Sequence, residues 1–196
     1  DPTLKIERNV DTHETLISGM GDTHIDVVLE LMRKRSNVHA ELKTPKVPYK
    51  ETVTALGEGR YKHKKQSGGR GQYAEVYCRV QPLKAGEDWF DDAVVGGVIP
   101  RNFIPACQKG FHDAMTKGSL AAYPVVNVKV SVYDGSYHDV DSSEIAFKIA
   151  AGRAFKEAMT KAKAVLLEPI MTVRVLIPNQ YVGDINGDLN HKRGRI

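Results

Sequence analysis

Two stretches in which apolar and polar residues strictly alternate constrain the fold of this chain more than any other feature. The apolar residues are Ala74, Val76, Cys78 and Val80 in the first stretch, and Val126, Val128, Val130 and Val132 in the second. Because successive side chains of a strand point to opposite faces, a period of two is typical of a strand with one buried and one solvated face. The chain is therefore expected to contain an antiparallel sheet that is half buried.

Two helices are predicted around these strands. The first is marked by apolar residues at helical spacing, which are Ile104, Cys107, Phe111 and Ala114. Gly118 is the predicted stop of this helix. The run 141–144, Asp-Ser-Ser-Glu, has the pattern of a capping box, and it opens a longer helix with Ile145, Ile149 and Gly152 facing inward. Strands and helices of this kind together indicate a mixed α+β fold.

Two local features complete this middle region. The valine-rich strand is predicted to end at the turn Asp134-Gly135, because this dipeptide is a frequent turn former. A short strand is predicted near Trp89 and Phe90. The middle region therefore carries a full set of strands and helices of its own.

The residues before the middle region predict a smaller unit. Short strands are expected over 4–6 and 15–18, a helix over 25–35, and a third strand over 38–42, where apolar residues again alternate. This order is that of an α+β sandwich that lacks about one strand and one helix.

The residues after the middle region predict another partial unit. A strand is expected over 172–177, followed after Pro178 by a helix that carries Val182, Ile185 and Leu189. Two incomplete ends around one complete middle indicate an excerpt from a longer protein.

A basic, glycine-rich segment is the strongest functional signal. Five Lys or Arg residues and no acid lie between Arg60 and Arg70, and Gly68, Gly69 and Gly71 permit positive φ angles and a close backbone approach. These properties suit contact with phosphate. The GxxxxGK[ST] spacing of a nucleotide-binding P-loop is absent from the chain. A basic hairpin whose charges are only solvated is the alternative interpretation.

The composition of the chain permits an anionic partner and argues against a membrane-spanning segment. A net charge of +4 and a pI near 9.0 permit an anionic partner without demanding one. Cys78 and Cys107 sit at apolar positions, which predicts reduced, buried thiols in a cytoplasmic protein. No apolar run approaches the roughly 18 residues that a membrane span needs, so no membrane association is expected.

Several ordered motifs resemble bacterial translation elongation factor G. The run 15–26 resembles part of its third domain, and 183–194 resembles the opening of its fifth. Motifs that resemble its fourth domain occupy 65–73, 96–100, 122–126, 135–144 and 166–170. The sequence departs from the family pattern at 101–103, Arg-Asn-Phe, and at Ala74, where glycine is common. These differences suggest a divergent or paralogous elongation-factor-G-like protein.

The resemblance implies a fold and a set of boundaries. Residues 1–53 would be a partial domain III, a ferredoxin-like sandwich without its first strand and helix. Residues 54–170 would be domain IV, with the α/β fold of ribosomal protein S5, and 171–196 the start of a second ferredoxin-like domain, domain V. The chain itself would hold no cofactor, because GTP and Mg²⁺ would bind in the GTPase domain of the parent protein.

The resemblance also implies a role in protein synthesis. Domain IV of such factors enters the decoding site of the small ribosomal subunit during translocation, where rRNA, tRNA and mRNA are its partners. The parent is expected to act as a cytoplasmic monomer. Two loops would form the RNA-binding tip, and their residues here are Lys64, Lys65, Gln66, Ser67, Gly68, Gly69, Arg70, Gly135, Ser136, Tyr137, His138 and Asp139. No covalent chemistry is expected of this chain.

His138 leaves other interpretations open. Its neighbours Asp139 and Asp141 would suit a metal ligand set, an acid/base pair or a helix cap. With the resemblance, contact of His138 with RNA is the favoured role. An elongation-factor-G-like paralogue that acts in ribosome recycling, an independent RNA-binding module and an enzyme centred on His138 remain the alternatives.

Overall fold

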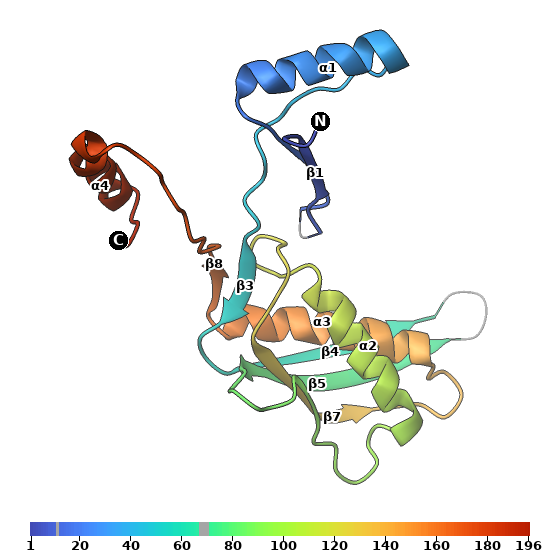
Figure 1. The fold of residues 1–196 in the computed structure, drawn as a ribbon. Helices are drawn as coiled ribbons and strands as arrows, with labels where there is room; N and C mark the ends of the chain where they lie inside the picture. The colour runs from blue at the N-terminus through green and yellow to red at the C-terminus, as the bar shows by residue number, and fades with distance from the viewer. Residues whose placement is uncertain (11, 67–70) are drawn as a thin grey trace.

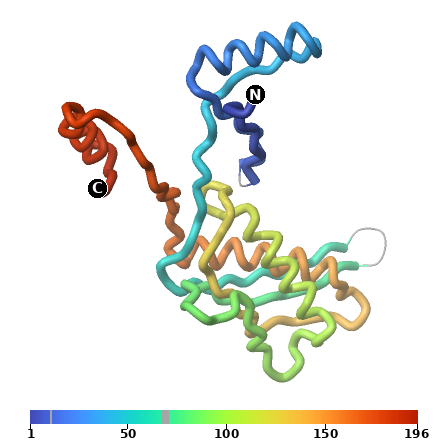
Figure 2. Tube along the Cα trace, in the orientation of Figure 1, coloured from blue at the N-terminus to red at the C-terminus, as the bar shows by residue number. Residues whose placement is uncertain are grey.

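The computed structural model describes residues 1–10, 12–66 and 71–196, and Figure 1 shows its fold. The predictions for Ser67, Gly68, Gly69 and Arg70 lie outside the described residues. A central unit of sheet and helices lies between two smaller segments, one at each end of the chain. Figure 2 follows the same path from the N-terminus to the C-terminus.

The N-terminal segment contains a two-stranded antiparallel sheet and one helix. Strands β1 (Lys5–Arg8) and β2 (Thr15–Ser18) pair with each other, and α1 (Asp22–Ser36) follows. Three basic residues in the last turn of α1 complement the helix dipole. The prediction of a strand over 38–42 is wrong. Residues that alternate between apolar and polar form a strand only where a partner strand is available to hydrogen-bond with them. Within the described residues β2 pairs with β1 alone, and the 38–42 backbone is irregular and exposed.

The central unit is built on a four-stranded sheet in the order β4-β5-β7-β6. Its strands are β4 (Gly57–Lys65), β5 (Gln72–Pro82), β6 (Phe90–Asp92) and β7 (Val128–Ser136). β4, β5 and β7 are antiparallel neighbours, whereas β6 pairs with β7 in parallel. Both alternating stretches are confirmed as half-buried strands, although β7 begins at Val128 rather than at Val126.

Helices α2 (Ile104–Met115) and α3 (Glu144–Lys161) cover one face of this sheet. The largest core side chains between the layers are Phe111, Phe147, Phe155, Ile99 and Met159. Gly57 and Gly59 of β4 face α3, where a Cβ atom on either would collide with the helix backbone at Ala158 or Ala154. These glycines therefore allow the helix to lie close against the strand. A short helix, η1 (Arg101–Phe103), leads into α2.

The predicted start and inward face of α3 need correction. Ser143 is the N-cap, and its hydroxyl accepts a hydrogen bond from the backbone N–H of Ala146 at 3.2 Å. Of the residues predicted to face inward, Ile145 is 64% exposed, whereas Ile149 and Gly152 are half-buried. The buried stripe consists instead of small and aromatic residues, which are Ala146, Phe147, Ala150, Ala151, Ala154, Phe155, Ala158 and Met159. Alanine is favoured there because the helix approaches the sheet so closely.

The predicted roles of two glycines are wrong. Gly135 is not in a turn, because β7 continues to Ser136 after a bulge and Gly135 pairs with Val76 of β5. Gly118 does not end α2, since the helix stops at Met115. Gly118 lies against the carboxylate of Glu51, which occupies the space that a Cβ atom would need.

A second antiparallel pair joins the two ends of the central unit. Strands β3 (Lys50–Val53) and β8 (Ala164–Leu167), neither of them predicted, pair so that Lys50 lies opposite Leu167. Glu51 of β3 is fully buried, and its carboxylate accepts hydrogen bonds from the backbone N–H groups of the loop residues Leu120, Ala121 and Tyr123 at 2.8–3.1 Å. This carboxylate therefore ties the loop after α2 to the strand pair.

The C-terminal segment contains the predicted helix but not the predicted strand. After Pro178, η2 (Asn179–Tyr181) leads into α4 (Val182–His191). Within the described chain, residues 172–177 form no strand, because no neighbouring strand hydrogen-bonds to them. Their side chains are correspondingly exposed, and Leu176 is 99% exposed. No described helix is long and apolar enough to cross a membrane. The domain boundaries at 53/54 and 170/171 stay predictions.

Candidate nucleic-acid interface

Two segments far apart in sequence meet at one end of the central unit. The N–H of Tyr73, just past the β4-β5 loop, donates to the carbonyl of Asp141 at 2.9 Å. The Ser142 hydroxyl donates to the carbonyl of Tyr73 at 2.8 Å, and the Tyr73 hydroxyl lies 2.8 Å from Ser136 Oγ. Figures 1 and 2 show the end of β4, the start of β5 and the 137–143 segment at the same extremity. We call this end the tip.

The predicted RNA-binding residues fall into two groups. Exposed residues of the tip are Lys64, Lys65, Gln66, Tyr137, His138 and Asp139. Gly135 and Ser136 are half-buried members of β7 and form the base of the tip rather than its surface. Cations and hydrogen-bonding groups therefore meet at one exposed end, a composition that suits contact with phosphate and 2′-hydroxyl groups.

His138 is held by its own turn. Its backbone N–H donates to Ser142 Oγ at 2.9 Å, and the N–H of Ser142 returns a bond to the His138 carbonyl at 3.0 Å. The imidazole Nδ1 lies 3.7 Å from Asp141 Oδ2 and accepts a long bond, 3.4 Å, from the N–H of Val140. The side chain is 57% exposed, so the ring can reach a ligand at the surface.

The described residues of the tip form no cluster that could hold a metal ion, and they present groups suited to binding an anionic polymer. No group of three or more His, Cys, Asp or Glu side chains within residues 1–10, 12–66 and 71–196 could hold a metal ion. Asp141 is the carboxylate that lies near the His138 ring. The tip presents donors and charge, which are the groups that bind an anionic polymer.

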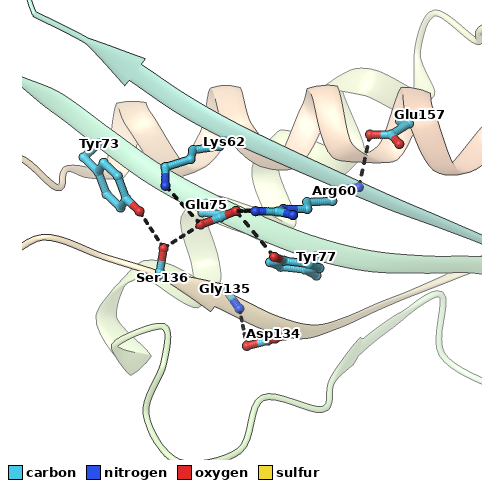
Figure 3. Close-up of polar contacts among 9 residues, drawn as sticks. All are labelled: Arg60, Lys62, Tyr73, Glu75, Tyr77, Asp134, Gly135, Ser136 and Glu157. Carbon is cyan, nitrogen blue, oxygen red and sulfur yellow. Dashed lines mark hydrogen bonds and ion pairs between the residues drawn. The ribbon is translucent and has the colours of Figure 1, made fainter.

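A buried carboxylate that sequence reasoning missed organises the base of the tip. Figure 3 shows Glu75 of β5 between Arg60 and Lys62 of β4 on one side and Ser136 of β7 on the other. Arg60 Nη2 and Nε lie 2.6 and 2.8 Å from Glu75 Oε1, while Ser136 Oγ donates to Oε2 at 2.8 Å. Lys62 Nζ is 3.8 Å from the same Oε2. One carboxylate therefore joins three strands.

The ionisation of Glu75 follows from these partners. Burial acts to raise the pKa of Glu75, but the hydrogen bonds from Arg60 and Ser136 and the positive charges of Arg60 and Lys62 lower the pKa below its usual value. The carboxylate therefore stays negative at neutral pH. A sequence signal for Glu75 did exist, because it is the single acid between Glu58 and Glu87 in a strongly basic stretch.

The two cysteines are buried and make no disulfide, as their apolar positions predicted. Burial is the main cause that raises the pKa of Cys78 and of Cys107 to about 12. Because the thiolate is the nucleophilic form, neither cysteine is a nucleophile at neutral pH.

Comparison with known proteins agrees with this architecture. Residues 1–44 match the family described as Elongation Factor G, domain III, residues 45–163 match Elongation factor G, domain IV, and residues 165–196 match Elongation factor G C-terminus. The fold and the order of these matches are those of part of a translation elongation factor. The chain belongs to the elongation factor G family.

Two relatives show how much of such a protein is present. An elongation factor G-like protein of Thermotoga maritima is 50% identical over all 196 residues, and a crystal structure of a Thermus thermophilus protein is 46% identical with a TM-score of 0.86 over the whole chain. The chain spans 29% of the length of each of these two proteins. The resemblance and the α+β class expected from the sequence are confirmed.

Proposed function

We propose that this chain is the ribosome-binding part of a translational GTPase that promotes the movement of tRNA and mRNA during elongation. In this proposal the tip enters the decoding site of the small subunit, and GTP and Mg²⁺ bind elsewhere in a cytoplasmic, monomeric parent protein. The ends of β4 and β5 meet the 137–143 segment at a single extremity, where Lys64 and Lys65 are exposed, and this is the observation that carries the proposal.

The tip suits a role that needs contact with RNA and no covalent chemistry. Lys64 and Lys65 supply positive charge, and Gln66 and Tyr137 supply neutral hydrogen-bonding groups. His138 donates to a phosphate or base, or stacks on one. Ser67, Gly68, Gly69 and Arg70 are proposed members of the same surface by family resemblance.

The mechanism is a barrier to backward movement. The tip binds the displaced tRNA and mRNA in their new position, so that a return step must first break these contacts. Contacts worth about 2 to 3 kcal/mol slow the return by roughly 30- to 150-fold. Glu75 supports this role by holding Arg60, Lys62 and Ser136 in one arrangement beneath the tip.

Substitution of His138 in the full-length factor tests the proposal. His138→Ala should slow tRNA movement on the ribosome while ribosome-stimulated GTP hydrolysis stays near the unmodified rate. His112→Ala is the matched control, because His112 is an exposed histidine of α2, on the covered side of the sheet. An unchanged rate of tRNA movement in the His138 variant would remove this residue from the mechanism.

Ribosome recycling by an elongation-factor-G-like paralogue is the second candidate. The Thermotoga maritima relative carries the name elongation factor G-like protein, and residues 101–103 depart from the usual family pattern. Separation of ribosomal subunits by the full-length factor, without promotion of tRNA movement, would favour this function. Turnover of GTP by the isolated chain that disappears in His138→Ala would instead support an enzyme.

A further inference from the structure

Within the described residues, one face of the sheet of the central unit is not covered by a helix. Because α2 and α3 pack on the other face, alternate side chains of β4 and β5 point away from them. This open face includes Glu58, Arg60, Lys62, Lys64, Tyr73, Glu75, Tyr77, Arg79, Tyr133, Asp134 and Ser136. Figure 3 shows how Arg60, Lys62, Tyr73, Glu75 and Tyr77 of this face lie close to one another. About half of the side-chain surface of Arg60, Lys62 and Arg79 is exposed, at 58%, 48% and 48%.

Three cations on the open face each lie over a tyrosine ring. The Arg60 guanidinium carbon is 5.0 Å from the ring centroid of Tyr77, and Lys62 Nζ is 5.2 Å from that of Tyr73. The third pair joins Arg79 and Tyr133 at 4.2 Å. Such pairs restrict the cation to one position above its ring. The rings support the cations and leave little aromatic face on which a base could stack.

Positive charge on the open face is concentrated toward the tip. Arg60, Lys62 and Lys64 follow one another on β4. The acids beside these three cations are Glu75, which pairs with Arg60, and Asp134, which lies opposite Tyr77. Glu58 lies farther from the tip, where it pairs with Arg79 at 2.8 Å. The open face also continues directly into the tip, because Lys64 pairs in register with Tyr73, whose hydroxyl contacts Ser136.

We propose that the open face is a second RNA-binding surface, which contacts phosphate groups of the RNA that the tip engages. The occupant is the sugar-phosphate backbone rather than unstacked bases, because the cations are exposed and the tyrosine rings are already covered. This inference rests on the proposed function, since it extends the path of the same RNA from the tip along the sheet.

Salt dependence of RNA binding tests the open face separately from the tip. The 196-residue chain is titrated against a fluorescein-labelled RNA stem-loop over a series of KCl concentrations. Two variants are compared with the unmodified chain, Lys62→Gln with Arg79→Gln for the open face and Lys65→Gln for the tip, because Lys64 belongs to both surfaces. The slope of log affinity against log salt should fall by about 1.4 to 1.8 in the double variant, which loses two phosphate contacts, and by about 0.7 to 0.9 in Lys65→Gln, which loses one.

A matched pair on the opposite face of the unit controls for net charge. Lys148→Gln with Lys156→Gln removes two exposed positive charges from α3 and should leave the slope unchanged. An equal loss of slope in this control would overturn the inference. If the tip variant lowers the slope and the open-face variant does not, RNA contacts the tip alone, so the inference fails and the proposed function stands. If only the open-face variant lowers it, the proposed role of the tip fails.

A variant that strengthens binding excludes misfolding as an explanation. Glu58→Gln removes the carboxylate paired with Arg79 and should tighten RNA binding about two- to fivefold, as expected for one exposed charge interaction. Asp113→Asn is its control, because Asp113 pairs with Lys148 at 2.6 Å on the opposite side. Tightening in Glu58→Gln alone supports the open face. No change, or equal tightening in both variants, contradicts it.

Discussion

The contact between Gly118 and Glu51 predicts a strong coupling between two substitutions. The three atoms nearest to a Cβ placed on Gly118 all belong to the Glu51 carboxyl group. The backbone of Gly118 has no positive φ, so the nearest source of strain for an alanine there is this carboxylate. Gly118→Ala should therefore act by displacing Glu51 from the loop that it binds.

The size of the effect follows from the hydrogen bonds that are lost. Glu51 accepts three backbone N–H groups, and each N–H left without an acceptor costs about 1 to 3 kcal/mol. The loop is partly exposed, so the low end applies and Gly118→Ala should destabilise the central unit by about 3 kcal/mol. Glu51→Ala should cost about 4 kcal/mol, because it also removes buried side-chain contacts. In the Glu51→Ala background, Gly118→Ala should be nearly neutral.

Urea unfolding of the four proteins measures this coupling. Trp89 is the single tryptophan of the chain and lies in the central unit, so its fluorescence reports on the part that the substitutions affect. The two single variants sum to about 7 kcal/mol, whereas the double variant should lose only about 4, which leaves a coupling energy of about 3 kcal/mol. The slope of free energy against urea should be the same in all four proteins.

Additivity would refute this reasoning. If the double variant loses the sum of the single losses to within about 0.5 kcal/mol, the two residues act independently and the carboxylate does not occupy the space beside Gly118. Gly183→Ala is a suitable control, because a methyl group at Gly183 would have no atom within 4 Å and should show no coupling to Glu51.

Three further predictions concern other parts of the central unit. Because the folded pKa of Glu75 lies below 4.5, its ionised form stabilises the fold above about pH 4.5, and this contribution is lost as the pH falls through the folded pKa. Glu75→Gln should lower the urea midpoint at neutral pH, and the difference between the midpoints of the variant and the unmodified chain should shrink as the pH falls below about 4.5. A difference that stays constant with pH would exclude this role. Cys78 and Cys107 should resist iodoacetamide in the folded chain near pH 8 and react in urea, and rapid labelling of the folded chain would show that they are accessible. Gly59→Ala should lower the free energy of unfolding by about 3 kcal/mol or more, since the new methyl group meets the backbone of α3. An unchanged urea midpoint would show that the helix can move aside.

Elements with a strong internal pattern were predictable from the sequence. β5 was recognised because Ala74, Val76 and Cys78 alternate with polar residues, and α2 because Cys107 and Phe111 repeat at helical spacing. Both patterns arise because the apolar residues of β5 and α2 are buried in the same core. The strands predicted over 38–42 and 172–177 were wrong, because alternation describes which side chains are apolar and not whether a neighbouring strand is present.

The residues that organise the base of the tip were harder to predict. Ser142 joins the two loops through the Tyr73 carbonyl, a contact between residues 69 positions apart. Glu75 resembled any polar residue on the exposed side of a strand, and only the fold shows that Arg60 and Ser136 bury it. Pairings of this kind depend on strand register, which local sequence does not reveal.

The pairing of β3 with β8 has a mechanical consequence. The chain enters and leaves the central unit at one place, because Lys50 and Leu167 are directly opposed, while the tip is at the far end of the sheet. A rotation of the unit about this strand pair would therefore displace the tip more than the parts near the pair. An 11-residue strand such as β5 is roughly 36 Å long, so a rotation of about 10° would move the tip by about 6 Å. Small rearrangements of the neighbouring domains would thus become nucleotide-scale displacements of the tip.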